Sequence, residues 1–249
     1  MRAELRDRRG SGEAVVYVPG IDGTGDYLLA TEARLAERFE VTTLRYLEGG
    51  EDTHAALAAS IAEVLDAQGL ARCVLLAESF GVAVALQLAL DDPGRARALL
   101  LVNGFARFER RARLALSMAF APLVSPKLYA LGRPLAARVG LFGNRREPET
   151  LGEFLAMEPG AIDAAYRARL GMIQHVDLLP RLHTLDRPVT LIASDRDKVV
   201  PAIPAARAMQ ERLPDAELEI LPGAGHLVLP LRSEPWIERI EALLDRAVD

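Results

Sequence analysis

The chain has 249 residues, half of them apolar, which is enough for one large hydrophobic core or for one core that carries a modest insertion. Its 30 basic and 35 acidic residues are mixed along the chain and give a net charge of −5, so no basic stripe indicates a nucleic-acid partner. Cys73 is the only cysteine, which excludes an internal disulfide, and with four scattered histidines we expect no metal site.

No part of the sequence predicts a membrane span. The first residues, MRAELRDRRGSGE, are charged throughout and lack the apolar segment of a signal peptide. The longest apolar stretch, residues 114–131, is interrupted by two serines, two prolines and a lysine, whereas a span needs about 20 nearly uninterrupted apolar residues. We therefore expect a cytoplasmic protein, of an oligomeric state that the sequence does not indicate.

Strand-like and helix-like segments alternate along the chain. In chain order we predict a strand at 14–18, a helix at 27–38, a strand at 41–45, a helix at 53–68, a strand at 72–77, a helix at 80–90 and a strand at 98–102. After a long interval follow a strand at 189–193, a helix at 201–213, a strand at 217–221 and a helix at 234–247. Apolar strands that are each followed by a helix indicate an α/β fold, with a mostly parallel sheet covered by helices on both faces.

The alternation is interrupted between residues 105 and 185. This interval has no good strand and carries helix-like segments at 110–120, 126–140, 147–157 and 160–173. We expect an α/β core formed by residues 1–104 and 186–249 and a helical cap formed by residues 105–185. An insertion at the carboxyl end of a parallel sheet lies where ligands bind.

The segment Ala77-Glu78-Ser79-Phe80-Gly81 connects a predicted strand to a predicted helix. The spacing, a small residue two before the serine and a glycine two after it, is typical of a sharp turn that exposes a nucleophilic serine at the start of a helix. An ordinary connection would also fit this segment alone. A nucleophilic serine needs a base, and the base needs an orienting acid.

Candidates for the base and the acid follow later strands. His226 lies in the glycine-rich segment LPGAGHL after the last predicted strand, and it is the only histidine at such a position. Asp195 and Asp197 both follow the strand at 189–193, and we prefer Asp197 because Asp195 abuts the strand and could brace the turn. Asn103, after the preceding strand, offers no carboxylate. The order Ser79, Asp197, His226 matches one known arrangement of a catalytic triad.

The segment PGIDGTG, residues 19–25, follows the first predicted strand. Its glycine spacing fits neither a dinucleotide-binding fingerprint nor a Walker loop. As a turn beside the nucleophile strand it predicts an oxyanion hole formed by the N–H groups of Ile21 and Phe80. We place Gly20 and Asp22 at the substrate as well, although Asp22 could instead only brace the turn.

These four motifs together resemble the α/β-hydrolase superfamily, in particular its serine esterases and lipases, over roughly residues 14–248. The segments PGIDGTG and AESFG also resemble the phytyl-ester synthase-type esterases and acyltransferases. Proline stands at position 19 where many members have histidine, and alanine at position 77 where they have glycine. The resemblance implies that the leading hairpin of the family is shortened or absent here.

The expected function is hydrolysis of a small-molecule carboxylic ester through an acyl-serine, with no cofactor. Apolar residues of the predicted cap, among them Met118 and Phe120, indicate either a pocket for an acyl chain or simple packing of the cap onto the sheet; the others are Leu114, Leu116, Leu123, Leu128, Tyr129 and Leu131. A thioesterase or an acyltransferase would use the same triad. A ligand-binding protein without catalysis is the alternative from another class.

Overall fold

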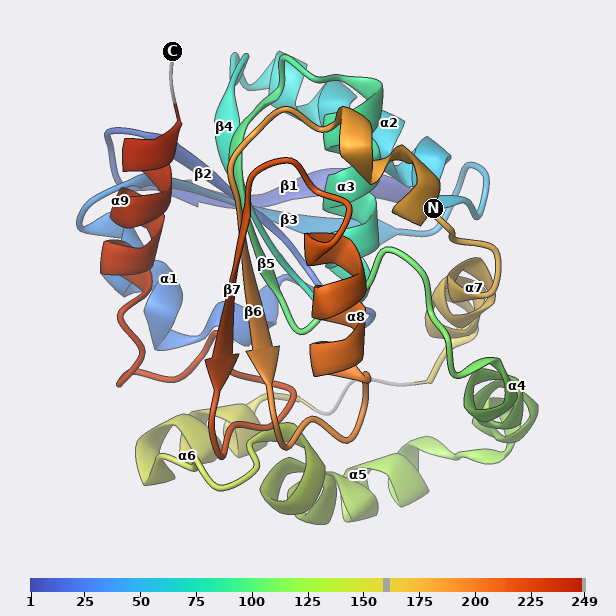
Figure 1. Ribbon diagram of the computed structural model, residues 1–249. Coiled ribbons are helices and arrows are strands. Elements are labelled where there is room, and N and C mark those ends of the chain that lie inside the picture. The colour runs from blue at the N-terminus through green and yellow to red at the C-terminus, as the bar shows by residue number, and fades with distance from the viewer. Residues whose placement is uncertain (159–161, 248–249) are drawn as a thin grey trace.

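A seven-stranded sheet forms the centre of the computed structural model, which describes residues 1–158 and 162–247 (Figure 1). The order of the strands is β1-β3-β2-β4-β5-β6-β7, and only the β1–β3 pair is antiparallel. The prediction of a mostly parallel sheet is therefore confirmed. The strands are β1 (Arg2–Arg9), β2 (Ala14–Val18), β3 (Glu40–Leu47), β4 (Cys73–Glu78), β5 (Ala96–Val102), β6 (Val189–Ser194) and β7 (Ala216–Leu221).

Helices cover both faces of this sheet, as Figure 1 shows. One face carries α2 (His54–Ala67), α3 (Phe80–Asp91) and α8 (Ala202–Gln210), and the other carries α1 (Ala30–Ala36) and α9 (Trp236–Arg246). Short 3-10 helices lie at Asp26–Leu28 and Leu179–Thr184. The helix predicted at 27–38 is shorter than expected because Leu29, with φ 49°, separates the 3-10 turn from α1.

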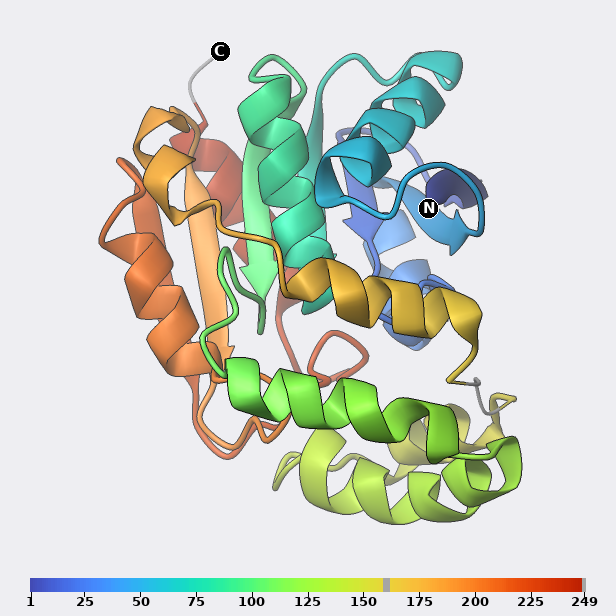
Figure 2. The ribbon, with the colours of Figure 1, turned by 90° about the vertical axis from the view of Figure 1, so that its right-hand side faces the viewer.

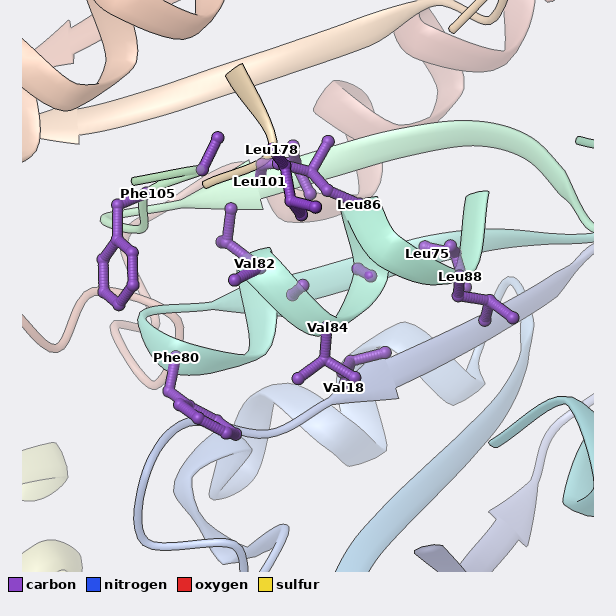
Figure 3. Packing of buried hydrophobic residues seen from close by; sticks show 14 of the residues in the cluster. Val18, Leu75, Phe80, Val82, Val84, Leu86, Leu88, Leu101, Phe105 and Leu178 are labelled. Carbon is purple, nitrogen blue, oxygen red and sulfur yellow. The ribbon is translucent and has the colours of Figure 1, made fainter. Parts of the chain in front are cut away.

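The core is densest around β4 and α3. Every residue of β4 is buried, and α3 is buried from Phe80 to Leu90. Figure 3 shows Val84 of α3 against Val18 of β2, and Val82 on the side of the helix toward Leu101 of β5. Because a close-packed interior hardly deforms, the connection between β4 and α3 is held firmly in place.

Strand β1 was not predicted. The sequence RAELRDRR reads as a charged leader, yet it forms an edge strand along β3. Its charged side chains pair with those of β3, as Glu4 does with Arg45 and Arg8 with Glu40. One antiparallel strand therefore stands where the family resemblance implied a shortened or absent hairpin, and its charges protect the open edge of the sheet.

The insertion between β5 and β6 is helical, as predicted. It consists of α4 (Arg111–Phe120), a 3-10 turn (Ala121–Leu123), α5 (Pro126–Ala136), a π-helical turn (Ala137–Leu141), α6 (Pro148–Ala156) and α7 (Ala164–Ile173). The start of the helix predicted at 160–173 lies outside the described residues. Figures 1 and 2 place these helices beyond the carboxyl ends of the parallel strands. Within residues 1–158 and 162–247, none of the helices has the length and apolar character to cross a membrane.

Candidate active site

Ser79 occupies the single residue between β4 and α3. Its backbone has φ 54° and ψ −120°, a conformation that is rare for any residue other than glycine. The turn requires a glycine at position 81, since a Cβ there would lie 2.4 Å from the carbonyl oxygen of Val18. The strained turn projects the serine hydroxyl beyond the carboxyl end of the sheet, at the N-terminus of α3.

Ser79, His226 and Asp197 form one hydrogen-bonded chain. His226 Nε2 lies 2.9 Å from Ser79 Oγ, and His226 Nδ1 lies 2.7 Å from Asp197 Oδ2. All three follow the carboxyl ends of different parallel strands, so residues 147 positions apart in sequence meet at one edge of the sheet. With its proton on Nδ1, His226 can accept the serine proton at Nε2.

The two candidate acids have different contacts. The second oxygen of Asp197 accepts hydrogen bonds from the N–H groups of Val199 and Val200, at 2.7 and 2.9 Å, and its side chain is only 1% exposed. Asp195 instead accepts the N–H of Gly223, at 2.7 Å, and so ties the β6 turn to the loop after β7. The preference for Asp197 over Asp195 therefore agrees with the contacts of both side chains.

Asn103 holds the loop that carries His226. Its side chain is buried, and its Nδ2 lies 2.8 Å from the His226 carbonyl oxygen, 3.2 Å from that of Gly225 and 2.9 Å from Ser194 Oγ. Its Oδ1 accepts the N–H of Ser194 at 2.8 Å. The backbone of Asn103 has φ 48°, which asparagine tolerates better than most residues. From the sequence, this position was notable only because it lacks a carboxylate, and the contacts of its amide were not predicted.

A buried carboxyl group lies directly before Ser79. Glu78 accepts a hydrogen bond from the Tyr17 hydroxyl, and burial raises the pKa of Glu78 to about 7. Burial also lowers the pKa of His226, but the nearby Asp197 carboxylate, and to a smaller extent Glu78, offset that effect, so that the net pKa of His226 is raised. The two groups also influence each other electrostatically, since His226 lowers the pKa of Glu78 and Glu78 raises the pKa of His226.

The Gly20–Gly25 loop lies beside Ser79. A Cβ placed on Gly20 would be 3.7 Å from the Ser79 Cβ, and the Gly23 N–H donates to the Gly20 carbonyl at 3.1 Å. Asp22 accepts the N–H and the hydroxyl of Thr24, at 2.9 and 2.6 Å. Those contacts brace the turn, which is the simpler of the two roles expected for Asp22.

Arg169 of α7 binds this loop from the side of the insertion. Its side chain is 3% exposed, and its guanidinium donates to the carbonyl oxygen of Ile21 at 2.6 Å and to that of Asp22 at 3.0 Å. The Phe80 N–H, at the first turn of α3, has no acceptor within its helix. The loop and the start of α3 therefore border the space in front of Ser79, and the loop is fixed by a residue that the sequence analysis missed.

A cavity of about 370 Å³ opens at Ser79. Its lining is mostly apolar, with Ser79 and Ser117 among the polar residues, and comes from the core and from the insertion; it includes Ile21, Phe105, Leu114, Phe120, Tyr166 and Val200. Phe120 thus lies where the sequence predicted a substrate contact. Met118 is not a lining residue: it is half-buried and packs against the core, with Gln174 beside its sulfur.

Four of the apolar residues that were expected either to line a pocket or to pack the cap onto the sheet have neither role. Leu116, Leu123, Leu128 and Leu131 are exposed to solvent. Of the residues that the structure describes, no three or more His, Cys, Asp or Glu side chains form a group suited to a metal ion.

The chain belongs to the alpha/beta hydrolase fold family, whose model matches residues 42–232. It is 30% identical over 234 residues to the RutD protein of Variovorax paradoxus, which is provisionally described as a carbamate hydrolase; the match covers 86% of this chain and 85% of that protein.

Two solved structures share the fold. A thermophilic esterase from Thermogutta terrifontis superimposes with a TM-score of 0.81 at 22% identity, over 98% of this chain and 93% of that one. BpoC of Mycobacterium tuberculosis, provisionally described as a non-heme bromoperoxidase, superimposes with a TM-score of 0.83 at 23% identity, over 100% and 98% of the two chains. The resemblance to phytyl-ester synthase-type proteins gains no support from these relatives.

Proposed function

We propose that the protein is a serine hydrolase that cleaves carboxylic esters through an acyl-serine intermediate. The observation that carries the proposal is the continuous hydrogen-bonded chain from Ser79 through His226 to Asp197. A serine hydroxyl at its ordinary pKa is a weak nucleophile, and this chain supplies both the base and the acid that orients it.

In the first half of the reaction, Ser79 Oγ attacks the ester carbonyl carbon while His226 Nε2 takes the hydroxyl proton. The C–O bond to the alcohol then breaks, and His226 returns the proton to the departing alkoxide. In the second half, His226 takes a proton from water, the hydroxide attacks the acyl-serine, and Ser79 leaves with the proton restored. Asp197 keeps the imidazole in the required tautomer and stabilises its cationic form.

The negative charge on the carbonyl oxygen requires hydrogen-bond donors. We assign these to the N–H groups of Ile21 and Phe80, which belong to the two segments that border Ser79. The N-terminus of α3 adds a favourable partial positive charge. A single donor of this kind contributes about 10²–10³ in rate.

The cavity supports an acyl chain as the group that the site accepts. Its volume of about 370 Å³ lies within the range of small-molecule sites, about 300–1,000 Å³. In this proposal residues 105–185 act as a cap, since Leu114, Phe120 and Tyr166 form one side of the cavity.

Hydrolysis of a carbamate is the second candidate, because of the sequence similarity to RutD. The same triad would attack a carbamate carbonyl. The apolar lining of the cavity favours an ester with a hydrocarbon acyl group over a small polar carbamate. A thioesterase and an acyltransferase would share the acyl-serine and differ in the leaving group or in the acceptor.

Two measurements test the proposal. A fluorophosphonate should add one adduct, on Ser79, and the Ser79→Ala variant should show none. Nitrophenyl esters from acetyl to palmitoyl should be hydrolysed by the wild type, with a maximum beyond butyryl, and not by Ser79→Ala. Equal activity in the variant would refute the mechanism, and tight binding of an ester without turnover would indicate a ligand-binding protein. Activity that vanishes beyond butyryl would refute the acyl cavity.

A further inference from the structure

Seven large apolar side chains of the insertion are exposed to solvent. The most exposed are Leu131, at 79%, and Leu123, at 70%, and the others are Leu116, Phe120, Leu128, Leu135 and Val139. Elsewhere in the described chain, Val199 and Ile220 are the other large apolar residues that are exposed, both at 39%. An apolar surface of this extent marks an interaction site when it is exposed as a patch rather than as scattered residues.

The residues of α5 and of the turn that follows it form one stripe. The stripe contains Leu128, Leu131 and Leu135, which follow one another at intervals of three and four residues and therefore share one side of the helix. On the same side, Lys127 lies four residues before Leu131 and Arg138 seven residues after it. In Figures 1 and 2, α5 lies at the outer edge of the molecule, away from the sheet. We call the seven apolar residues together with Lys127 and Arg138 the outer face of the insertion.

The charge along the segment that carries the outer face is entirely of one sign. Residues 110–146 contain eight basic residues and no Asp or Glu, so the rest of the chain carries −5 − 8 = −13. Four of these basic side chains are exposed and, within the described residues, make no ion pair; they are Arg110, Lys127, Arg138 and Arg146. An otherwise acidic protein therefore presents one cationic and apolar surface.

We propose that the outer face docks onto the surface of an anionic lipid bilayer. Apolar residues flanked by lysine and arginine are the pattern of helices that lie in the headgroup region, where leucines enter the lipid and cations meet its phosphates. A second copy of the chain fits less well, because a two-fold contact through this face would bring its basic residues together. An acidic protein partner would satisfy the cations but would also have to cover five leucines that are each more than half exposed.

The docking surface is continuous with the cavity. Phe120 is more than half exposed on the outer face and also lines the cavity that contains Ser79. Under the proposed function, this continuity would let an apolar substrate pass from the lipid to the serine. Docking itself does not depend on catalysis, so Ser79→Ala should bind vesicles as the wild type does.

Flotation with vesicles tests the docking. The wild type should bind vesicles of phosphatidylglycerol and phosphatidylcholine in equal parts, bind pure phosphatidylcholine vesicles at least about tenfold more weakly, and dissociate at high salt. The Leu131→Asp/Leu135→Asp variant and the Lys127→Glu/Arg138→Glu variant should each bind the anionic vesicles at least about tenfold more weakly. Neither pair lines the cavity, so hydrolysis of a soluble short-chain ester serves as the check that both variants are folded.

The control is Ile220→Asp, which places one negative charge on an exposed apolar residue of β7, far from the insertion in sequence. It should bind vesicles as the wild type does. Failure of the wild type to bind anionic vesicles at low salt would overturn the proposal, as would equal binding by the leucine variant. The proposal would also be overturned if analytical ultracentrifugation showed a dimer of the wild type that is absent in the leucine variant, because the face would then serve self-association.

Discussion

Arg169 is expected to control the oxyanion hole without touching the substrate. Its guanidinium donates to two carbonyl oxygens of the loop that supplies the Ile21 N–H, at 2.6 and 3.0 Å. Both contacts come from a buried charged donor, and such hydrogen bonds each contribute about 1.5–3 kcal/mol. In Arg169→Met the loop loses both contacts, and its carbonyl groups must turn toward water to regain partners.

The magnitude follows from what the Ile21 N–H contributes. Loss of one oxyanion donor costs about 10²–10³ in kcat, or about 2.7–4 kcal/mol. We expect kcat for a nitrophenyl ester to fall by about 10² in Arg169→Met, with KM nearly unchanged, because the ground-state carbonyl gains little from the donor. The kcat of Arg169→Lys should lie between those of the wild type and of Arg169→Met, because a lysine ammonium cannot donate to both carbonyl oxygens as the planar guanidinium does.

A transition-state analogue separates this role from a structural one. A trifluoromethyl ketone forms a tetrahedral adduct with the serine and places an oxyanion in the hole, so its inhibition constant should rise by the same factor as kcat falls. The control is Arg167→Met, which replaces an exposed arginine of the same helix; its guanidinium donates to the Ile162 carbonyl and not to the Gly20–Gly25 loop. If Arg169→Met lowers thermal stability but leaves kcat and analogue affinity unchanged, the argument is refuted.

Substitutions at Asn103, Glu78 and Gly81 also have defined outcomes. Asn103→Gly should lower the free energy of unfolding in urea by about 1–3 kcal/mol for each buried acceptor left unpaired. Asn103→Ala should lower it by about 1 kcal/mol more, because alanine is strained at the positive φ of this position. Glu78→Gln removes a negative charge that raises the pKa of His226, so the acid limb of the pH–rate profile should move to lower pH. Since the pKa of Glu78 rises from 4.5 to about 7 on folding, the wild type should lose about 3 kcal/mol of stability as pH increases between those values, and the variant should not. Gly81→Ala should destabilise by about 1–3 kcal/mol, because its Cβ would overlap two carbonyl oxygens at 2.4 and 2.5 Å, whereas Gly152→Ala, with open space at its Cβ, should be neutral or stabilising.

Each of these predictions has a contradicting result. Equal stability of the glycine and alanine variants at position 103 would show that φ there is relaxed. An unmoved acid limb in Glu78→Gln would mean that the carboxyl group is neutral in the active enzyme or does not act on His226. Similar unfolding curves for the two glycine variants would show that the β4–α3 turn can yield.

The sequence predicted the parts of the site that depend on local pattern. Six of the seven strands coincide with strand-like segments that have clear ends in the sequence, and Ser79, Asp197 and His226 each come just after such an end. The parallel order of strands then brings those ends to one edge of the sheet, so the three side chains could be proposed together from chain order alone. Strand β1 escaped this reasoning because its residues are mostly charged, and the ion pairs that stabilise it form only in the folded sheet.

The residues that were missed act over long separations. Arg169 bonds a carbonyl 148 positions away, and nothing near it in sequence distinguishes it from the other arginines of the insertion. Asn103 carried a usable signal, since it is a polar residue directly after a buried strand, but its amide meets a loop more than 120 positions later. Exposure of the leucines on α5 was equally hidden, because helical spacing gives a stripe but does not say whether anything covers it.

The insertion is bound to the core on both sides of the nucleophile. Arg169 bonds the loop that contains Ile21, while the turn at Leu141–Asn144 contacts the loop that carries His226: the Leu227 N–H donates to the Leu141 carbonyl and the Asn144 N–H to the Gly223 carbonyl, each at 2.7 Å. A Cβ on Gly225 would lie 2.4 Å from the Leu141 carbonyl oxygen, so the two loops are in direct contact. A lid that merely covered a finished site would make no such bonds. The insertion therefore contacts the loops on both sides of Ser79, so the geometry there depends on these contacts as well as on the sheet.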